Sequence, residues 1–425
     1  MERKIEKFLK KWQKDILRKP LIIYGPKQIG KTYTALSFGK KEYKNTVYFN
    51  TENNEQLFKL FAKEKITEKI ILNLSLISKE TILQDDTLII FDNIKDLEII
   101  KGLKLFGSEK SNYHIIGITS KKGKLSEFKG EELQFKGMNE MDFEEYLWAR
   151  NEKNLAEIIK ESFIKRKTNP FHKLALDIFY EYIATGGLPE AVEARINGKS
   201  DNEIDIIKQK LIKVYEHELL YNNVLIDIPR GLDVIISVPR QLEKENKKFQ
   251  YGLLGTGKRK KEYESTIKFL TTNQILIMNN KVSTIKSPLS SCKEKDSFKI
   301  FMPDDGLLYT MLHLNKKQFL TDEEKREILF ENHIAKTLSE LGYSLYYYQS
   351  EGKAEVNFIV QNRMGQIIPI ELTTKANSKA KSLAVFMKKF TVPVAYRITE
   401  NNFSTKKDVR YIPIYAIFCI NETKV

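Results

Sequence analysis

The sequence predicts an α/β protein with a parallel-sheet domain over residues 1–140, a helical middle over 141–290 and a second α/β domain over 291–425. The first domain is indicated by short, β-branched apolar segments that alternate with stretches long enough for helices, a pattern typical of a parallel sheet covered on both faces. Longer amphipathic helices are expected beyond about residue 140. Alternating strands return after residues 286–297, a Ser-, Lys- and Pro-containing segment that we interpret as a linker.

The length of 425 residues suggests two to three domains, and an apolar content of 41% is typical of a packed globular protein. The net charge of +15 favours acidic partners such as nucleic acid, although a merely lysine-rich chain would also have it. Two widely separated cysteines, Cys292 and Cys419, fit a reducing compartment. Since no apolar run approaches the ~20 residues needed to span a bilayer and no signal-peptide pattern is present, we expect a cytoplasmic protein without a membrane partner.

The first domain is expected to begin with a helix over residues 1–18 that ends before Pro20. We interpret the apolar stripe of this helix as packing on the sheet, with membrane attachment as the less favoured alternative. The strands expected to form the parallel sheet are residues 21–25, 45–50, 69–74, 87–92 and 113–120.

A glycine-rich segment, GPKQIGKT, lies between the first strand and a helical stretch and fits the pattern G-x-x-x-x-G-K-[ST]. In this pattern the glycines let backbone N–H groups and a helix N-terminus face the phosphates of a nucleotide. Lys31 would reach the β- and γ-phosphates, and the hydroxyl of Thr32 would join a Mg²⁺ shell. The predicted cofactors are therefore ATP and Mg²⁺. The predicted nucleotide-binding residues are Gly25, Pro26, Lys27, Gln28, Ile29, Gly30, Lys31 and Thr32.

The segment LIIFDNI, residues 88–94, ends a predicted strand in Asp92. We expect this strand beside the P-loop strand, where Asp92 would hold Mg²⁺ through water. The next residue is Asn93, where P-loop enzymes usually have a glutamate that prepares the attacking water. An asparagine can hydrogen-bond a water but cannot accept its proton, so we predict slow or absent hydrolysis with Asn93 at the catalytic position.

Another candidate at the catalytic centre is Ser120, which with Thr119 ends the strand at residues 113–120. Folds of this kind place a polar residue there that senses the γ-phosphate. A turn or N-cap role for Thr119 and Ser120 is an equally good alternative.

The middle region contains the order of a winged helix, because residues 263–285 predict a helix and then a β-hairpin that turns at Asn279-Asn280. The preceding KRKK, residues 258–261, is a candidate for contact with a DNA backbone, and a solvated turn explains it equally well. DNA and a protein are thus the two candidate partners. The sequence leaves the oligomeric state open, and the residues that qualify as an arginine finger by type alone are Arg150, Arg230 and Arg240.

Segments along almost the whole chain are similar to those of one known family. They are KPLIIYGPKQIGKTY, FGKKEYKNTVYFN, GMNEMDFEEYLWA, YIATGGLPEAV, VPRQLEKENKKFQYGLL, FMPDDGLL, AEVNFIVQNRMGQIIPIEL and YIPIYAIF. The chain resembles prokaryotic AAA-type ATP-binding proteins that carry a C-terminal domain of unknown function, DUF4143. The resemblance implies a P-loop ATPase core, a helical and winged-helix middle, and a C-terminal α/β domain like PD-(D/E)XK restriction endonucleases. At the nucleotide site the chain departs from the family at Asn93, where the family has glutamate, and at Thr119, where the family has glycine.

The same resemblance places a nuclease-like site at Glu331, Asn357, Glu371 and Thr373. The two glutamates match acidic residues of the family, whereas Asn357 replaces an aspartate and Thr373 a lysine. Because such a site needs two or three carboxylates for Mg²⁺ and a lysine that stabilises charge, we do not expect nuclease activity. Strand alternation leaves Glu355 and Lys375 as neighbours able to rebuild the site, each about 6–7 Å along its strand.

The function expected from the sequence is that of an ATP–Mg²⁺-binding AAA-type ATPase or nucleotide switch with weak hydrolysis. Its C-terminal domains would couple the nucleotide state to binding of DNA or protein. The alternatives are an ATP-controlled DNA nuclease and a non-catalytic signalling scaffold.

Overall fold

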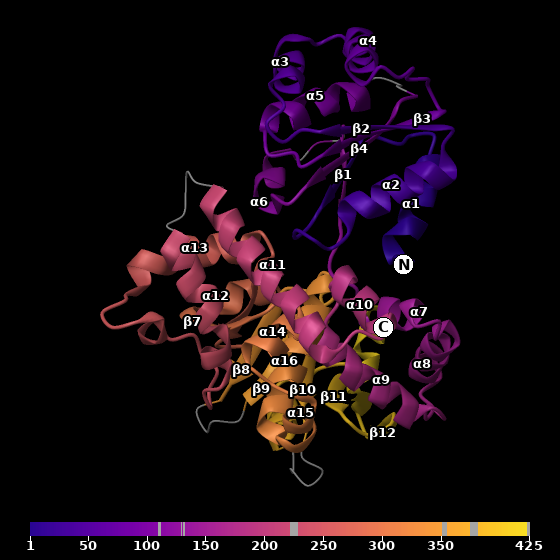
Figure 1. The fold of residues 1–425 in the computed structure, drawn as a ribbon. Coiled ribbons are helices and arrows are strands. Elements are labelled where there is room, and N and C mark those ends of the chain that lie inside the picture. Colours follow the sequence, from indigo (N-terminus) through magenta and orange to yellow (C-terminus); the bar gives the residue numbers. More distant parts are fainter. Residues whose placement is uncertain are drawn as a thin grey trace. The chain divides into compact units, whose positions relative to one another are not determined.

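The computed structural model describes residues 1–108, 112–128, 130, 132–221, 228–350, 355–374 and 381–422 (Figure 1). The chain forms two compact units. Unit 1 comprises Met1–Asn139 with Thr272–Gln274, and unit 2 comprises Glu140–Thr271 with Ile275–Val425. In the described part of the chain, no helix is both long enough and apolar enough to cross a bilayer.

Unit 1 is built on a five-stranded parallel sheet with the order β2-β3-β4-β1-β5. Its strands are β1 (Leu21–Tyr24), β2 (Asn45–Asn50), β3 (Thr87–Asp92), β4 (His114–Thr119) and β5 (Gln134–Gly137). Its helices are α1 (Lys4–Lys14), α2 (Lys31–Glu42), α3 (Glu55–Lys63), α4 (Thr67–Ser78), α5 (Leu97–Ser108) and α6 (Lys122–Leu125), followed by the 3₁₀ turn η1 (Ser126–Phe128).

The two faces of this sheet are covered by different helices, α1 and α2 on one face and α3, α4 and α5 on the other (Figure 1). Alternate residues of each strand point to opposite faces, so Ile89 packs with the second set of helices and Ile90 with the first. The predicted parallel sheet covered on both faces is confirmed. The first helix packs on the sheet through Ile5, Leu9 and Trp12, as expected.

Two predictions for unit 1 are wrong. Residues 69–74 do not form a strand but lie in α4, which buries Ile70, Ile71 and Leu74 at helical spacing. A short apolar run does not by itself distinguish a strand from a buried helix, and here packing against the sheet decides for the helix. The fifth strand is instead β5, whose four residues are all half-buried and gave no apolar signal.

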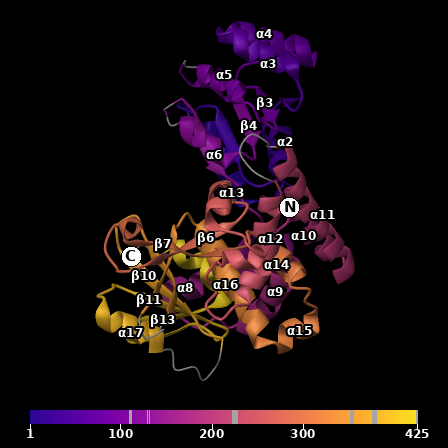
Figure 2. The same cartoon turned by 90° about the vertical axis from the view of Figure 1, so that its left-hand side faces the viewer.

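Unit 2 contains a mixed eight-stranded sheet with the order β12-β13-β11-β10-β9-β8-β6-β7. Figure 2 shows β10, β11 and β13 side by side at one end of it. The strands are β6 (Ile277–Val282), β7 (Lys293–Phe301), β8 (Leu345–Gln349), β9 (Glu355–Gln361), β10 (Ile367–Leu372), β11 (Ala395–Thr399), β12 (Ser404–Lys406) and β13 (Val409–Pro413). Pairs β6/β8, β10/β11 and β11/β13 are parallel, and the other neighbours are antiparallel.

Along the chain, helical segments precede the first strand of this sheet, lie between its strands and follow the last one. They are α7 (Phe143–Ala149), α8 (Lys153–Lys165), α9 (His172–Thr185), α10 (Pro189–Ile196), α11 (Asp201–Tyr221), α12 (Ile228–Leu242), α13 (Lys260–Thr272), α14 (Asp305–Met311), α15 (Lys316–Thr321), α16 (Glu323–Glu340) and α17 (Lys381–Lys389). The 3₁₀ segments are η2 (Tyr251–Leu254), η3 (Leu289–Cys292) and η4 (Ile414–Glu422).

The predicted hairpin turn at Asn279-Asn280 is wrong, because both residues lie inside β6. Asn279 pairs with Lys299 of β7 on one side and with Leu345 of β8 on the other. Its buried amide nitrogen donates to the backbone oxygen of Asn357 at 3.0 Å, so a residue typical of turns has a hydrogen-bond partner for its N–H group within the sheet. Residues 286–297, the segment interpreted as a linker, do not separate two sheets. Residues 293–297 belong to β7, and residues 286–292 lie between β6 and β7, neighbouring strands of one sheet that continues into β8.

The segment TGGLPEA joins α9 to α10 and contacts the start of α14. Gly186 follows α9 with a φ of +82°, and Pro189 opens α10. A β-carbon on Gly186 would lie 2.3 Å from Oδ1 of Asp304, and the N–H of Gly187 donates to Oδ2 of the same carboxylate at 2.6 Å. Glycine is therefore required at position 186 both by backbone conformation and by the close approach of Asp304.

Candidate nucleotide-binding site

The predicted phosphate-binding loop connects β1 to α2 and depends on two glycines. A β-carbon on Gly25 would lie 2.0 Å from the carbonyl oxygen of Met138, so only glycine fits against this backbone. Gly30 has a φ of +87° and is the N-cap residue of α2. The loop thus ends at a helix N-terminus, where backbone N–H groups suit an anion.

Lys31 is buried at the first position of α2 and turns back over the loop. Its ammonium donates to the carbonyl oxygen of Gly25 at 2.8 Å and also to that of Pro26. The lysine charge is therefore held inside the loop, where the β- and γ-phosphates of a nucleotide bind in P-loops.

The two residues predicted to hold Mg²⁺ are brought together. The hydroxyl of Thr32 donates to Oδ2 of Asp92 at 2.7 Å, and Asp92 is 2% exposed. The backbone N–H of Asn93 donates to Oδ1 of Asp92 at 2.7 Å, which fixes the carboxylate at the end of β3. One hydroxyl and one carboxylate form an all-oxygen donor set, which suits Mg²⁺ that completes its shell with waters and phosphate oxygens.

The strand that carries Asp92 is not beside the P-loop strand, and that prediction is wrong. β4 lies between β1 and β3 and pairs with both. Asp92 nevertheless meets Thr32, because the loop and the first turn of α2 extend across the carboxyl end of β4 to the end of β3.

Tyr48 of β2 is a residue of this site that the sequence did not indicate. Its hydroxyl donates to Oδ2 of Asp92 at 3.0 Å. Partial desolvation of the hydroxyl, with the neighbouring carboxylate, raises the pKa of Tyr48 to about 12, although the residue is 39% exposed. No local signal predicts the contact, because it joins the adjacent strands β2 and β3 across 44 residues of sequence.

Asn93 and the end of β4 frame the remaining side of the site. Asn93 has a φ of +57°, and its amide donates to Oδ1 of Asn50 at 3.2 Å. Thr119 donates to the carbonyl oxygen of Ile94 at 2.7 Å and accepts from the N–H of Lys121 at 3.1 Å. These contacts give Thr119 the turn role that was its alternative reading. Ser120 directly follows β4 and is half-buried.

The residues of the nuclease-like site are tied to separate partners. Glu371 forms an ion pair with Arg397 at 2.8 Å and accepts the N–H of Leu383 at 3.1 Å. Burial raises the pKa of Glu371, against the opposing effect of Arg397. Asn357 accepts the N–H of Leu372 at 3.0 Å through its side chain. The backbone N–H of Thr373 donates to Ile398 at 2.9 Å.

Glu331 of α16 faces two lysines instead of a second free carboxylate. It pairs with Lys247 at 2.5 Å and with Lys299 at 3.2 Å, and Lys299 also pairs with Glu355 at 2.5 Å. Burial opposes ionisation of Glu331, but the two ammonium groups outweigh it and lower its pKa to about 2. Lys375 lies outside the described residues. Among the described residues no cluster of three or more His, Cys, Asp or Glu side chains is arranged to hold a metal.

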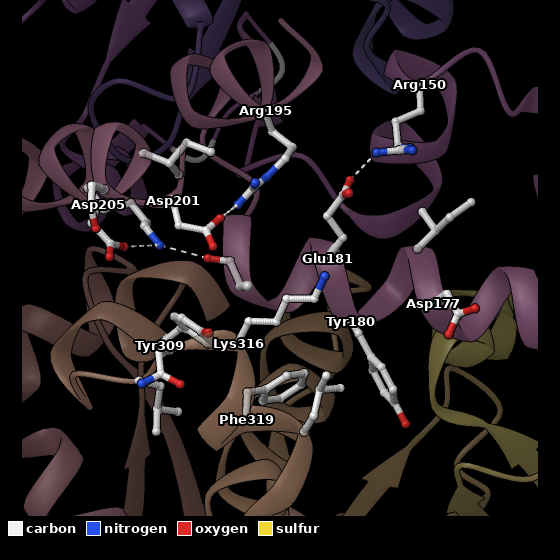
Figure 3. Close-up of a pocket in the computed structure, with 18 of the residues that line it drawn as sticks. Arg150, Asp177, Tyr180, Glu181, Arg195, Asp201, Asp205, Tyr309, Lys316 and Phe319 are labelled. Carbon is white, nitrogen blue, oxygen red and sulfur yellow. Dashed lines mark hydrogen bonds and ion pairs between the residues drawn. The ribbon is translucent and has the colours of Figure 1, made fainter. Parts of the chain in front are cut away.

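A cavity of about 700 Å³ in unit 2 is lined by α9, α11 and residues 309–320 (Figure 3). Most of its charged side chains neutralise one another. The pairs are Arg150–Glu181, Arg195–Asp201 and Lys208–Asp205. The two other charged residues of the lining, Asp177 and Lys316, have opposite signs, so the cavity favours neither anions nor cations.

Comparison with known protein families identifies three successive regions. Residues 17–147 match an AAA domain, residues 176–318 a domain of unknown function (DUF8612), and residues 326–417 a domain of unknown function (DUF4143). The DUF8612 region includes β6 and β7 and was not expected from the sequence. No curated protein matches the chain. The chain therefore begins with an AAA domain of the P-loop NTPase class, which implies nucleotide binding, typically with Mg²⁺, and continues through a DUF8612 region into a DUF4143 domain.

Proposed function

We propose that this chain is an ATP–Mg²⁺-binding nucleotide switch with weak hydrolysis, whose nucleotide state controls binding of DNA or protein by unit 2. The observation that carries the proposal is the contact between Thr32 and Asp92. It brings the metal-binding hydroxyl and carboxylate together beside a loop that already holds Lys31 inward. The bound Mg²⁺ would bridge phosphate oxygens and neutralise their charge.

Weak hydrolysis follows from Asn93. Its side chain lies at the end of β3, next to the predicted metal ligand, and donates to Asn50. It has no group that accepts a proton from water, so a general-base contribution of about 10²–10⁴-fold is absent. Asparagine also tolerates the positive φ of this position better than glutamate does. The backbone conformation is therefore a second reason for asparagine at position 93.

The decisive experiment measures ATP affinity and steady-state hydrolysis for the wild type, Lys31→Ala, Asn93→Glu and Asn93→Asp. The wild type should bind ATP and turn over slowly, and Lys31→Ala should lose binding. Asn93→Glu should raise the rate on the order of 10²-fold. Asn93→Asp supplies a carboxylate that tolerates the positive φ, and separates missing base chemistry from backbone strain. A brisk wild-type rate that neither carboxylate changes would refute the switch.

The binding role of unit 2 is supported by its C-terminal topology and not by its charge, because most of the net charge of +15 lies in unit 1. The order α16-β8-β9-β10-α17-β11, with β10 parallel to β11, suits the proposed restriction-endonuclease-like fold. We favour a domain retained for binding over an active nuclease. Lys299 brings a positive charge between Glu331 and Glu355, where a metal ion would otherwise be needed, and Glu371 is held by Arg397.

A further inference from the structure

Arg3 makes an unusual pair of contacts for a residue that precedes the first helix. Arg3 is only 6% exposed. Nη1 donates to the carbonyl oxygen of Ile29 at 2.8 Å, and Nη2 donates to that of Asn139 at 2.6 Å. One guanidinium therefore joins the phosphate-binding loop to the last residue of unit 1 before the chain enters unit 2.

The contact with Ile29 bears on the shape of the loop. In a trans peptide the C=O and the following N–H point in opposite directions. Because Arg3 holds the oxygen of Ile29, the N–H of Gly30 is directed away from the guanidinium. Backbone N–H groups of this loop are the ones that bind phosphate, so Arg3 orients one of them without itself touching the nucleotide.

The contact with Asn139 lies in a segment that already packs on the loop. The N–H of Met138 donates to the carbonyl oxygen of Tyr24 at 2.8 Å. Its carbonyl oxygen approaches Gly25 so closely that no β-carbon fits between them. A movement of the loop at Gly25 would therefore displace Met138, and a movement at Ile29 would displace Asn139 through Arg3.

Just beyond Asn139 the chain is anchored within unit 2. The N–H of Met141 donates to Gly187 at 2.7 Å, and its carbonyl oxygen accepts the hydroxyl of Tyr182 at 2.9 Å. Two residues span at most about 7 Å, so there is little slack between the end held by Arg3 and this anchor.

We propose that Arg3 is a positioning residue that couples the state of the phosphate-binding loop to the peptide entering unit 2, residues 138–142. When a nucleotide binds, Lys31 exchanges the carbonyl oxygens of Gly25 and Pro26 for phosphate oxygens, and the loop readjusts. Arg3 transmits the readjustment from Ile29 to Asn139. The inference rests on the proposed nucleotide binding and adds the route by which it is communicated.

The test uses the full chain and measures two quantities, ATP–Mg²⁺ affinity and hydrogen exchange of residues 138–142 with and without ATP. The variants are Arg3→Ala, Arg3→Lys and, as a matched control, Lys11→Ala on the exposed side of α1. In the wild type and the control, ATP should slow exchange of residues 138–142. Arg3→Ala should weaken ATP binding on the order of tenfold, and at saturating ATP the exchange of residues 139–142 should be the same as without ATP. Met138 is left out of this comparison because it contacts Tyr24 directly.

Each outcome decides one claim. If the wild type does not bind ATP, the proposed function fails. If it binds ATP but exchange of residues 139–142 does not change, or if Arg3→Ala retains the change in residues 139–142 at saturation, the coupling is wrong and the proposed function stands. Arg3→Lys keeps a charge but has one nitrogen instead of a fork, so it should recover part of the affinity without the full protection. If Arg3→Ala does not fold, Arg3→Lys is the variant that tests the coupling.

Discussion

The ammonium of Lys299 lies 3.2 Å from Oε1 of Glu331, and both side chains are only 1% exposed. Burial acts to lower the pKa of Lys299, but Glu331 and Glu355 together raise it overall. The lysine is thus a permanent cation between two carboxylates, and unit 2 needs no metal ion to balance them.

Lys299→Ala should therefore destabilise unit 2 by about 3–5 kcal/mol, the usual cost of removing one partner from a buried ion pair. Urea unfolding measures this. Lys295→Ala removes an exposed lysine of the same strand and should change stability by less than about 0.5 kcal/mol. A chelator should leave wild-type stability unchanged. Strong destabilisation of the wild type by the chelator would show that a metal, and not Lys299, neutralises the carboxylates.

The contact between Gly186 and Asp304 can be tested with a pair of glycine substitutions. Gly186 and Gly198 have nearly equal φ angles, +82° and +77°, but a β-carbon on Gly198 meets nothing within 4 Å. Gly198→Ala carries backbone strain on the order of 1 kcal/mol, whereas Gly186 also has a ψ of −175°, in a region that essentially only glycine adopts, so its strain is larger. Gly186→Ala must in addition displace Asp304, so it should cost about 1–3 kcal/mol more in urea unfolding. Equal losses would mean that Asp304 moves aside freely.

The exposed part of KRKK is the surface to test for DNA. Lys258 and Lys260 already pair with Asp233 and Asp296, whereas Arg259 and Lys261 are exposed. If unit 2 binds DNA there, the double variant Arg259→Ala/Lys261→Ala should weaken binding. It should also reduce the slope of log affinity against log salt by about 2. The matched control is Lys63→Ala/Lys69→Ala in unit 1. Salt-independent binding by the wild type would leave a protein as the partner.

Local patterns predicted most of unit 1 and little of its long-range geometry. The loop from Gly25 to Thr32 is recognisable because glycine, lysine and threonine at fixed spacing are needed by the backbone and by phosphate chemistry alike. The separation of β1 from β3 by β4 depends on pairing across the whole domain, and no single segment encodes it. The contact of Arg3 is also not encoded locally, because its acceptor Asn139 lies 136 residues away.

In unit 2 the misleading residues were polar ones that find partners through tertiary contacts. Asn279 suggested a turn, yet in the sheet its amide finds the backbone of Asn357. Lys299 gave no signal of burial, because only its two carboxylate partners from other elements make a buried ammonium tolerable.

The pH dependence of unit 1 should be dominated by His114 at the start of β4. This histidine is 4% exposed, and its Nδ1 is 2.6 Å from the hydroxyl of Tyr43. Burial, reinforced by the charge of Arg18, lowers the pKa of His114 from 6.5 to about 4, against the effect of Asp85. Between these values the unfolded chain binds a proton that the folded chain does not. Stability is therefore full above pH 6.5 and falls as the pH drops toward 4, by on the order of 2–3 kcal/mol.

Urea unfolding at several pH values checks this prediction. In a Trp148→Phe background only Trp12 remains, so fluorescence reports unit 1 alone. His114→Gln should flatten the dependence between pH 4.5 and 6.5, whereas His313→Asn, at an exposed position of unit 2, should preserve it. An unchanged slope in His114→Gln would assign the titration to another group.

The role of Asp92 as a metal ligand predicts a specific loss of Mg²⁺ dependence. Asp92→Asn keeps the size of the side chain and removes its charge, so Mg²⁺ should no longer strengthen ATP binding, a loss on the order of tenfold. Tyr48→Phe removes only the 3.0 Å hydrogen bond to Asp92, so it should weaken Mg²⁺-dependent binding by less than about fivefold. Titration of a fluorescent ATP analogue with and without Mg²⁺ measures both effects. If Asp92→Asn retained the wild-type response to Mg²⁺, the contact with Thr32 would be a structural hydrogen bond and the metal would be held elsewhere.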